Sequence, residues 1–133
     1  QLDKKCTIRV RSTISSTSTK NTLTIKGPTS ASGMSRYEYE TKLSKLESSN
    51  LFKICHKPII EKTRYIFIYN NMKWELDEFH GENQGLLIGE IELENEWAQF
   101  DIPNFVLKEV TGEIRYYNSM LQQQPYKNWT DIS

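Results

Sequence analysis

Acidic side chains occupy alternate positions in one stretch of the chain, residues 86–94. There Glu90, Glu92 and Glu94 alternate with the apolar Ile91 and Leu93. Successive side chains of an extended strand point to opposite faces, so the stretch predicts a strand with one acidic face and one apolar face. A single strand of this kind is more often an outer strand with its acids in water. Its carboxylates can also bind a divalent cation, because clustered oxygen ligands suit Mg²⁺ or Mn²⁺.

The same alternation recurs elsewhere, with two like charges flanking one residue. It is found at residues 9–11, 38–40 and 75–77, and residues 62–64 are similar. Like charges on one sheet face repel, so a sheet that faces water would mix the two signs. In this sequence each of these stretches carries charges of one sign only. A β-barrel explains this arrangement if helices cover its apolar outer face and both basic and acidic strands line its lumen.

The basic positions of such a lumen form a set suited to polyphosphate, because guanidinium groups bind phosphate oxygens in pairs and lysines add point charges. This set is Arg9, Arg11, Lys26, Lys62 and Arg64. The carboxylates opposite would repel a polyanion unless a divalent cation lay between them. They are Glu38, Glu40, Glu75, Asp77, Glu90 and Glu92. The combination predicts phosphate chemistry assisted by a metal ion.

Each of these charges taken singly is more often an ordinary surface charge, so the prediction depends on the set. His56 and His80 have no partner at a metal-ligand spacing, and we do not include them in the site. The tryptophans Trp74, Trp97 and Trp129 are more typical of packing than of base stacking.

Composition narrows the class of protein. The 133 residues are 26% charged and 37% hydrophobic, which suits one domain over residues 1–133. A formal net charge of zero argues against a general nucleic-acid binder, and no apolar run approaches the roughly 20 residues of a membrane span. Cys6 and Cys55 lack companion ligands, so we expect free thiols and a cytoplasmic location. The oligomeric state stays open, a homodimer included.

Hydrophobic periodicity places these residues on an α+β framework. We expect strands at residues 6–12, 22–26, 36–40, 59–69, 72–79 and 86–94, with the last three forming an antiparallel meander. Asn70-Asn71 suits a tight hairpin turn because asparagine tolerates positive φ. Helices are expected at residues 41–52 and 111–124, packed on the outside of the sheet.

An internal repeat connects the basic and acidic positions. At an offset of 66 residues, Arg9 maps onto Glu75, Arg11 onto Asp77 and Lys26 onto Glu92. Two copies of one strand unit would give this pattern if they closed a single barrel, with one copy binding an anion and the other binding cations.

Six sequence segments, in their order along the chain, resemble the CYTH superfamily, the triphosphate tunnel metalloenzymes. These segments are residues 7–11, 23–27, 36–40, 61–65, 74–79 and 89–93. Residues 109–118 resemble bacterial, triphosphatase-like members, and the resemblance covers nearly the whole chain. It implies a closed antiparallel eight-stranded β-barrel, a tunnel. It further implies hydrolysis of the terminal phosphate of inorganic tripolyphosphate or a small organic triphosphate, with attack by water and with one or two Mg²⁺ or Mn²⁺ ions.

The resemblance also implies a role for each charged position. The residues that contact the triphosphate would be Arg9, Arg11, Lys26, Lys62 and Arg64. Metal ligands would be Glu92, Glu90, Asp77, Glu40 and Glu38. The residues that act directly in catalysis would be Glu90, Glu92 and Lys62. The partner is then a small triphosphate substrate, with no nucleic acid and no membrane.

One departure from the family pattern concerns the hallmark first strand, Glu-x-Glu-x-Lys. Residues 38–42 have this spacing, but their place in the order matches a later strand. The repeat places the hallmark about 28 residues before Gln1, so we expect that the first barrel strand is absent from this sequence.

Two alternatives to a triphosphatase remain open at this point. One is an adenylyl cyclase of the class IV type, which uses the same kind of tunnel. The other is a tunnel that binds polyphosphate or nucleotide without turnover. A carrier of apolar ligands fits poorly, because its lumen would be apolar. The sequence does not choose among tripolyphosphate, thiamine triphosphate and nucleoside triphosphates.

Overall fold

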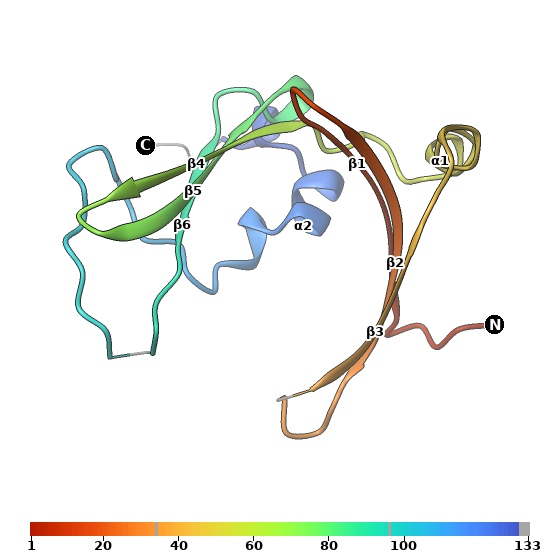
Figure 1. Cartoon of the computed structure of the whole chain (residues 1–133), viewed down its shortest axis with the longest axis horizontal. Coiled ribbons are helices and arrows are strands. Elements are labelled where there is room, and N and C mark those ends of the chain that lie inside the picture. Colours follow the sequence, from red (N-terminus) through yellow and green to blue (C-terminus); the bar gives the residue numbers. More distant parts are fainter. Residues whose placement is uncertain (34, 96, 131–133) are drawn as a thin grey trace. The chain divides into compact units, whose positions relative to one another are not determined.

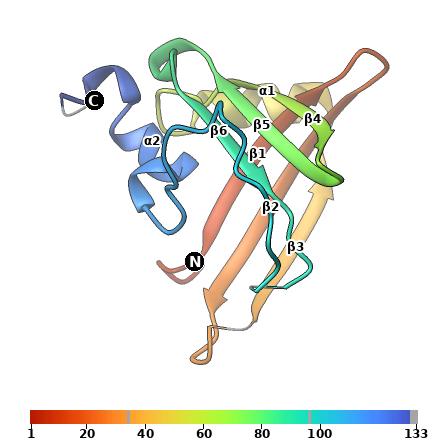
Figure 2. The ribbon, with the colours of Figure 1, turned by 90° about the vertical axis from the view of Figure 1, so that its left-hand side faces the viewer.

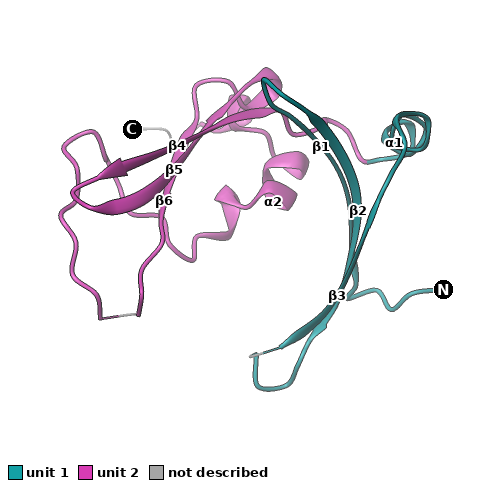
Figure 3. Ribbon diagram, viewed as in Figure 1, with its two compact units in different colours: residues 1–55 teal, residues 56–133 magenta. Residues whose placement is uncertain are grey.

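The structure is a computed structural model that describes residues 1–33, 35–95 and 97–130. The chain divides into two compact units, residues 1–55 and residues 56–133 (Figure 3). Each unit contains a three-stranded antiparallel sheet and one α-helix, in agreement with the α+β prediction. The prediction of one domain over residues 1–133 stays a prediction.

The first unit is a meander of three strands followed by a helix. Its elements are β1 (Thr7–Ile14), β2 (Thr19–Thr29), β3 (Arg36–Lys42) and α1 (Lys45–Lys53). The strands lie side by side in the order β1-β2-β3 (Figure 2). The first two strands are longer than predicted because the polar run at residues 12–21 is itself mostly paired, with Thr13 opposite Lys20. Threonine is β-branched and favours this extended conformation.

Helix α1 begins at Lys45 rather than at the predicted residue 41. Residues 41 and 42 still pair with β2, and Ser44 then caps the helix. The helix contacts β1 and β2, and it lies on the convex side of their sheet (Figure 1). The helix buries little apolar surface at Leu46, which is 71% exposed.

The second unit is a meander of β4 (Lys62–Tyr69), β5 (Met72–Phe79) and β6 (Leu87–Ile91), in that order. Asn70 and Asn71 connect β4 to β5 with φ of 49° and 61°, which confirms the tight hairpin. The rest of the unit contains α2 (Asn118–Gln123) and 3₁₀ turns at Gly81–Asn83, Ile114–Tyr116 and Tyr126–Asn128.

Two predicted elements in this unit are too long. Strand β6 ends at Ile91, which pairs with Trp74, although the backbone N–H of Glu92 still donates to the carbonyl of Lys73 at 3.4 Å. The helix predicted for residues 111–124 covers only 118–123, since Tyr117 is extended with ψ of 143°. Ile114 and Tyr117 are 62% and 51% exposed, so a longer helix would gain little stability from burying them.

The core of the second unit consists of the buried side chains of Phe79, Leu86 and Leu121. Leu121 comes from α2, whereas Phe79 ends β5 and lies on the same sheet face as Asp77, two residues earlier. Helix α2 therefore packs at one end of the charged face. This differs from the prediction that the helices cover only the apolar outer face.

The described residues form two three-stranded sheets and no closed eight-stranded barrel. They do support the internal repeat. Arg9 pairs with Thr24 in the first hairpin, and Glu75 pairs with Glu90 in the second, which is the same register shifted by 66 residues. In the part of the chain that the structure describes, no helix is long and apolar enough to cross a membrane.

Candidate active site

The first charged face lies on the sheet β1-β2-β3. Directly paired residues of antiparallel strands point to the same face. One face of this sheet therefore carries the side chains of three pairs, which are Arg9 with Thr24, Thr24 with Glu40, and Lys26 with Glu38. Arg11 lies on the same face because it is two residues after Arg9 in the strand. This sheet thus unites three predicted phosphate-binding residues with two predicted metal ligands.

Contacts across this face are sparse. The Thr24 hydroxyl donates to Glu40 Oε1 at 2.9 Å, and Lys26 Nζ lies 3.7 Å from Glu38 Oε1. The Nε group of Arg9 is buried and has no hydrogen-bond partner among the described residues. A buried guanidinium N–H with no acceptor is costly to the folded protein, so this group is suited to an incoming anion.

The second charged face lies on the sheet β4-β5-β6. Arg64 is paired with Asp77, and Glu75 is paired with Glu90. Alternation along β4 adds Lys62 to the same face. Ile66 and Ile68 follow on that face and are exposed, so β4 is charged only in its first half.

Asp77 is the centre of an ion-pair network on this face, and its side chain is 7% exposed. Arg64 donates from Nε to Oδ1 at 2.7 Å and from Nη2 to Oδ2 at 2.9 Å. Lys62 Nζ lies 2.8 Å from Oδ2. Burial alone would raise the pKa of Asp77, but the hydrogen bonds from Arg64 and Lys62 outweigh it, and the pKa is lowered. The bond to Asp77 likewise raises the pKa of Arg64.

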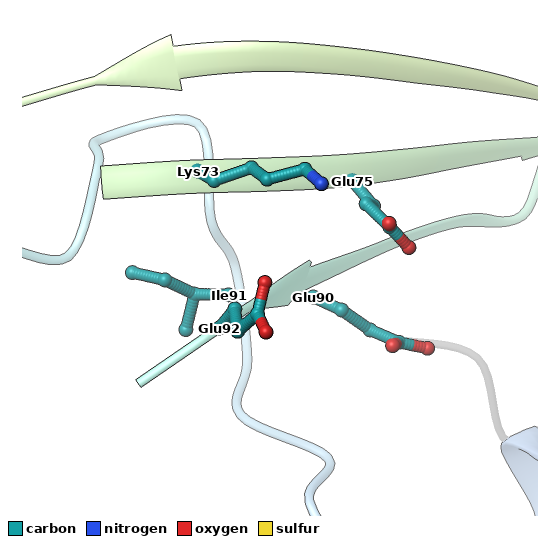
Figure 4. A pocket seen from close by; sticks show the side chains of 5 residues that line it. All are labelled: Lys73, Glu75, Glu90, Ile91 and Glu92. Atoms are coloured by element: carbon teal, nitrogen blue, oxygen red, sulfur yellow. The ribbon is translucent and has the colours of Figure 1, made fainter. Parts of the chain in front are cut away.

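Next to this network lies a pocket of about 370 Å³ (Figure 4). Its lining residues are Lys73, Glu75, Glu90, Ile91 and Glu92. Glu75 and Glu90 face each other across β5 and β6, and the backbone N–H of Glu92 donates to the carbonyl of Lys73 at 3.4 Å. The pocket therefore collects the predicted ligands Glu90 and Glu92 together with Glu75.

The chemistry of this pocket fits a hard divalent cation. Like charges directly opposite each other destabilise a sheet, and Arg64 Nη1 offsets only part of this charge, at 3.2 Å from Glu75. Carboxylate oxygens are the ligands that Mg²⁺ and Mn²⁺ prefer. Among residues 1–33, 35–95 and 97–130, no three His, Cys, Asp or Glu side chains are close enough to hold a metal ion together.

The predicted metal set is thus distributed over three places. Glu90 and Glu92 line the pocket, Asp77 is held by the two cations, and Glu38 and Glu40 lie on β3 in the other unit. Sequence reasoning missed the position of Lys73 on this face. Its spacing of two from Glu75 and four from Asp77 was a usable signal.

Comparison with known proteins identifies the family of this chain. The model of the CYTH domain matches residues 1–120. An inorganic triphosphatase of Acetivibrio thermocellus is 45% identical over 130 residues, which cover 97% of this chain and 80% of that protein. No solved structure matches the chain significantly. Because the domain model spans most of the chain and this relative is nearly half identical, the chain belongs to the CYTH domain family.

Proposed function

We propose that this protein is a divalent-metal-dependent triphosphatase. It hydrolyses the terminal phosphate of inorganic tripolyphosphate or of a small organic triphosphate. The observation that carries the proposal is the 45% identity with an inorganic triphosphatase along 97% of the chain. The two charged sheet faces supply groups suited to such a substrate, and a cytoplasmic location is part of the proposal.

Binding of the triphosphate begins with the arginines and lysines. Arg9, Arg11 and Lys26 share one face, and the buried Nε–H of Arg9 can donate to a phosphate oxygen. Arg64 has five N–H donors, and its Nε and Nη2 are held by Asp77. Asp77 thereby fixes the plane of the guanidinium, while the N–H groups that remain can bind phosphate.

Charge compensation is the second requirement. We assign Glu90 and Glu92, with Asp77, Glu38 and Glu40, to the binding of Mg²⁺ or Mn²⁺, and Glu75 joins them at the pocket. Such a cation would neutralise charge on the transferred phosphoryl group and lower the pKa of a water molecule. Lys62, held by Asp77 at 2.8 Å, would keep a positive charge beside that phosphoryl group during the reaction.

A closed barrel is part of the same proposal. The two sheets would belong to one eight-stranded tunnel within a single domain. The family assignment and the matching register of the two hairpins support this arrangement. A lumen made in this way would expose the substrate to the charged faces of both sheets.

The test is orthophosphate release by the full-length protein from tripolyphosphate, ATP and thiamine triphosphate. Each substrate is supplied with Mg²⁺, with Mn²⁺ or with a chelator. We expect metal-dependent release that is fastest from tripolyphosphate. Cyclic AMP and pyrophosphate from ATP would show a cyclase instead, and unchanged substrates would show a binding module.

Two variants test the assigned roles. Arg11→Ala should raise KM about tenfold or more, because a charge-assisted phosphate contact is lost. Glu92→Gln should lower metal-dependent kcat by at least about tenfold. Wild-type rates in both variants would contradict the assigned site.

A further inference from the structure

A lysine shares the carboxylate pocket of the second unit. Lys73 is the second residue of β5 and lines the pocket together with Glu75, Glu90 and Glu92 (Figure 4). It lies on the same sheet face as Glu75 and Asp77, because side chains two residues apart in a strand point the same way. Its backbone carbonyl accepts from Glu92, so its place beside the pocket is fixed by the sheet.

The cations of this face differ in how they are engaged. Lys62 and Arg64 are held by Asp77, and Arg64 also contacts Glu75. Lys73 is exposed, and among the described residues its ammonium forms no ion pair, although three carboxylates line the same pocket. An internal counter-ion for these carboxylates would lie within contact distance of one of them. Lys73 therefore has a free ammonium group at an acidic pocket.

We propose that Lys73 is a substrate-binding residue whose ammonium contacts, at the carboxylate pocket, a phosphoryl group of the bound triphosphate other than the one that is transferred. The inference rests on the proposed triphosphatase function. A lysine with its long flexible side chain and three donors can follow a phosphate oxygen into such a site. Arg64 and Lys62 are held by Asp77, so their side chains have less freedom to do so.

This role predicts a specific kinetic effect. The charge of a phosphoryl group that is not transferred stays the same during the reaction. An ammonium that contacts such a group therefore binds the ground state and the transition state about equally. Its removal therefore raises KM more than it lowers kcat. A purely structural lysine would change neither parameter, and an internal counter-ion would change the metal requirement instead.

The experiment compares wild type, Lys73→Met and Lys73→Arg in the full-length protein, with tripolyphosphate at saturating Mg²⁺. For Lys73→Met we expect KM to rise about tenfold and kcat to change less than about threefold. Lys73→Arg keeps the charge and should stay within about twofold of wild type in KM. Lys108→Met is the matched control, because Lys108 is an exposed lysine of the same unit that pairs with Glu113 at 3.3 Å.

An unchanged KM in Lys73→Met would overturn the inference. If a Mg²⁺ titration of the same variant then showed half-maximal activity at a lower Mg²⁺ concentration, Lys73 would be a counter-ion that competes with the metal. Calorimetric binding of a non-hydrolysable imido analogue of tripolyphosphate with Mg²⁺ gives Kd without turnover. Weaker binding by Lys73→Met would support the inference even if wild type released no phosphate, an outcome that would contradict only the proposed function.

Discussion

A single carboxylate organises the cations of the second charged face. Asp77 binds Arg64 through both of its oxygens and Lys62 through Oδ2. The side chain of Asp77 is 7% exposed, so these bonds are less screened by solvent than ordinary surface ion pairs. A buried carboxylate with two cationic partners holds both in fixed positions, which reduces the cost of ordering them when substrate binds.

Asp77→Asn should lower the free energy of unfolding by about 2 kcal/mol at pH 7, because two cations lose a charged partner. The pKa of Asp77 is lowered in the folded protein, so its stabilising effect is present above the unfolded pKa of about 3.9. That effect is lost as the pH falls through the lower folded value. Urea denaturation at pH 7 and at successively lower pH should show the wild type and the variant converging below about pH 4.

Asp101→Asn is the matched control for this measurement. Asp101 is exposed and accepts one long hydrogen bond, from Asn70 at 3.4 Å. Its replacement should change the free energy of unfolding by less than about 0.5 kcal/mol. Equal losses in the two variants, or a difference at Asp77 that does not vary with pH, would contradict the role given to the ion-pair network.

At the scale of elements, local sequence decides where helix α1 begins. Ser44 Oγ accepts from the backbone N–H of Glu47 at 3.0 Å, and Glu47 Oε1 accepts from the backbone N–H of Ser44 at 2.8 Å. This reciprocal pair is a capping box, which satisfies two donors at the helix start. The backbone bond from Ser44 also lowers the pKa of Glu47.

Ser44→Ala should lower the free energy of unfolding by about 1 kcal/mol, because the cap at Glu47 loses its acceptor. Ser49→Ala is the control within the same helix. Ser49 is exposed and away from the cap, and alanine there should leave stability unchanged or raise it by up to about 0.5 kcal/mol. Chemical denaturation followed by far-UV circular dichroism measures both, and a loss in Ser49→Ala as large as that in Ser44→Ala would contradict the capping role.

At the scale of the whole molecule, the repeat links the two units. The hairpins β1-β2 and β5-β6 share one register at the offset of 66 residues, with Arg9 and Thr24 corresponding to Glu75 and Glu90. A shared register, with basic Arg9 in one hairpin and acidic Glu75 in the other, is what two copies of one strand unit would have. It supports the proposal that both units belong to one domain.

If the chain is a single domain, then a change in the first unit must alter the unfolding of the second. All 3 tryptophans, Trp74, Trp97 and Trp129, lie in residues 56–133, so their fluorescence reports on the second unit. Ser44→Ala, in the first unit, should lower the urea midpoint measured by tryptophan fluorescence as much as the midpoint measured by circular dichroism. An unchanged fluorescence midpoint would show that the units unfold independently.

The sequence by itself determined which residues share a face. Alternation is a local property of extended backbone, so the sets around Arg9, Glu40, Arg64 and Glu90 were predictable from spacing, as was the hairpin at Asn70. Local signals also placed the strands to within a few residues at most ends, and the family assignment confirmed the resemblance carried by these strings.

Only the tertiary structure decided which charges are partners. The length of α2 depends on how little apolar surface it buries. Spacing predicted which charges each strand carries, whereas strand register paired Asp77 with Arg64 and placed Lys73 at the pocket. Such choices depend on pairing between distant segments and on burial, which the period of one strand does not contain.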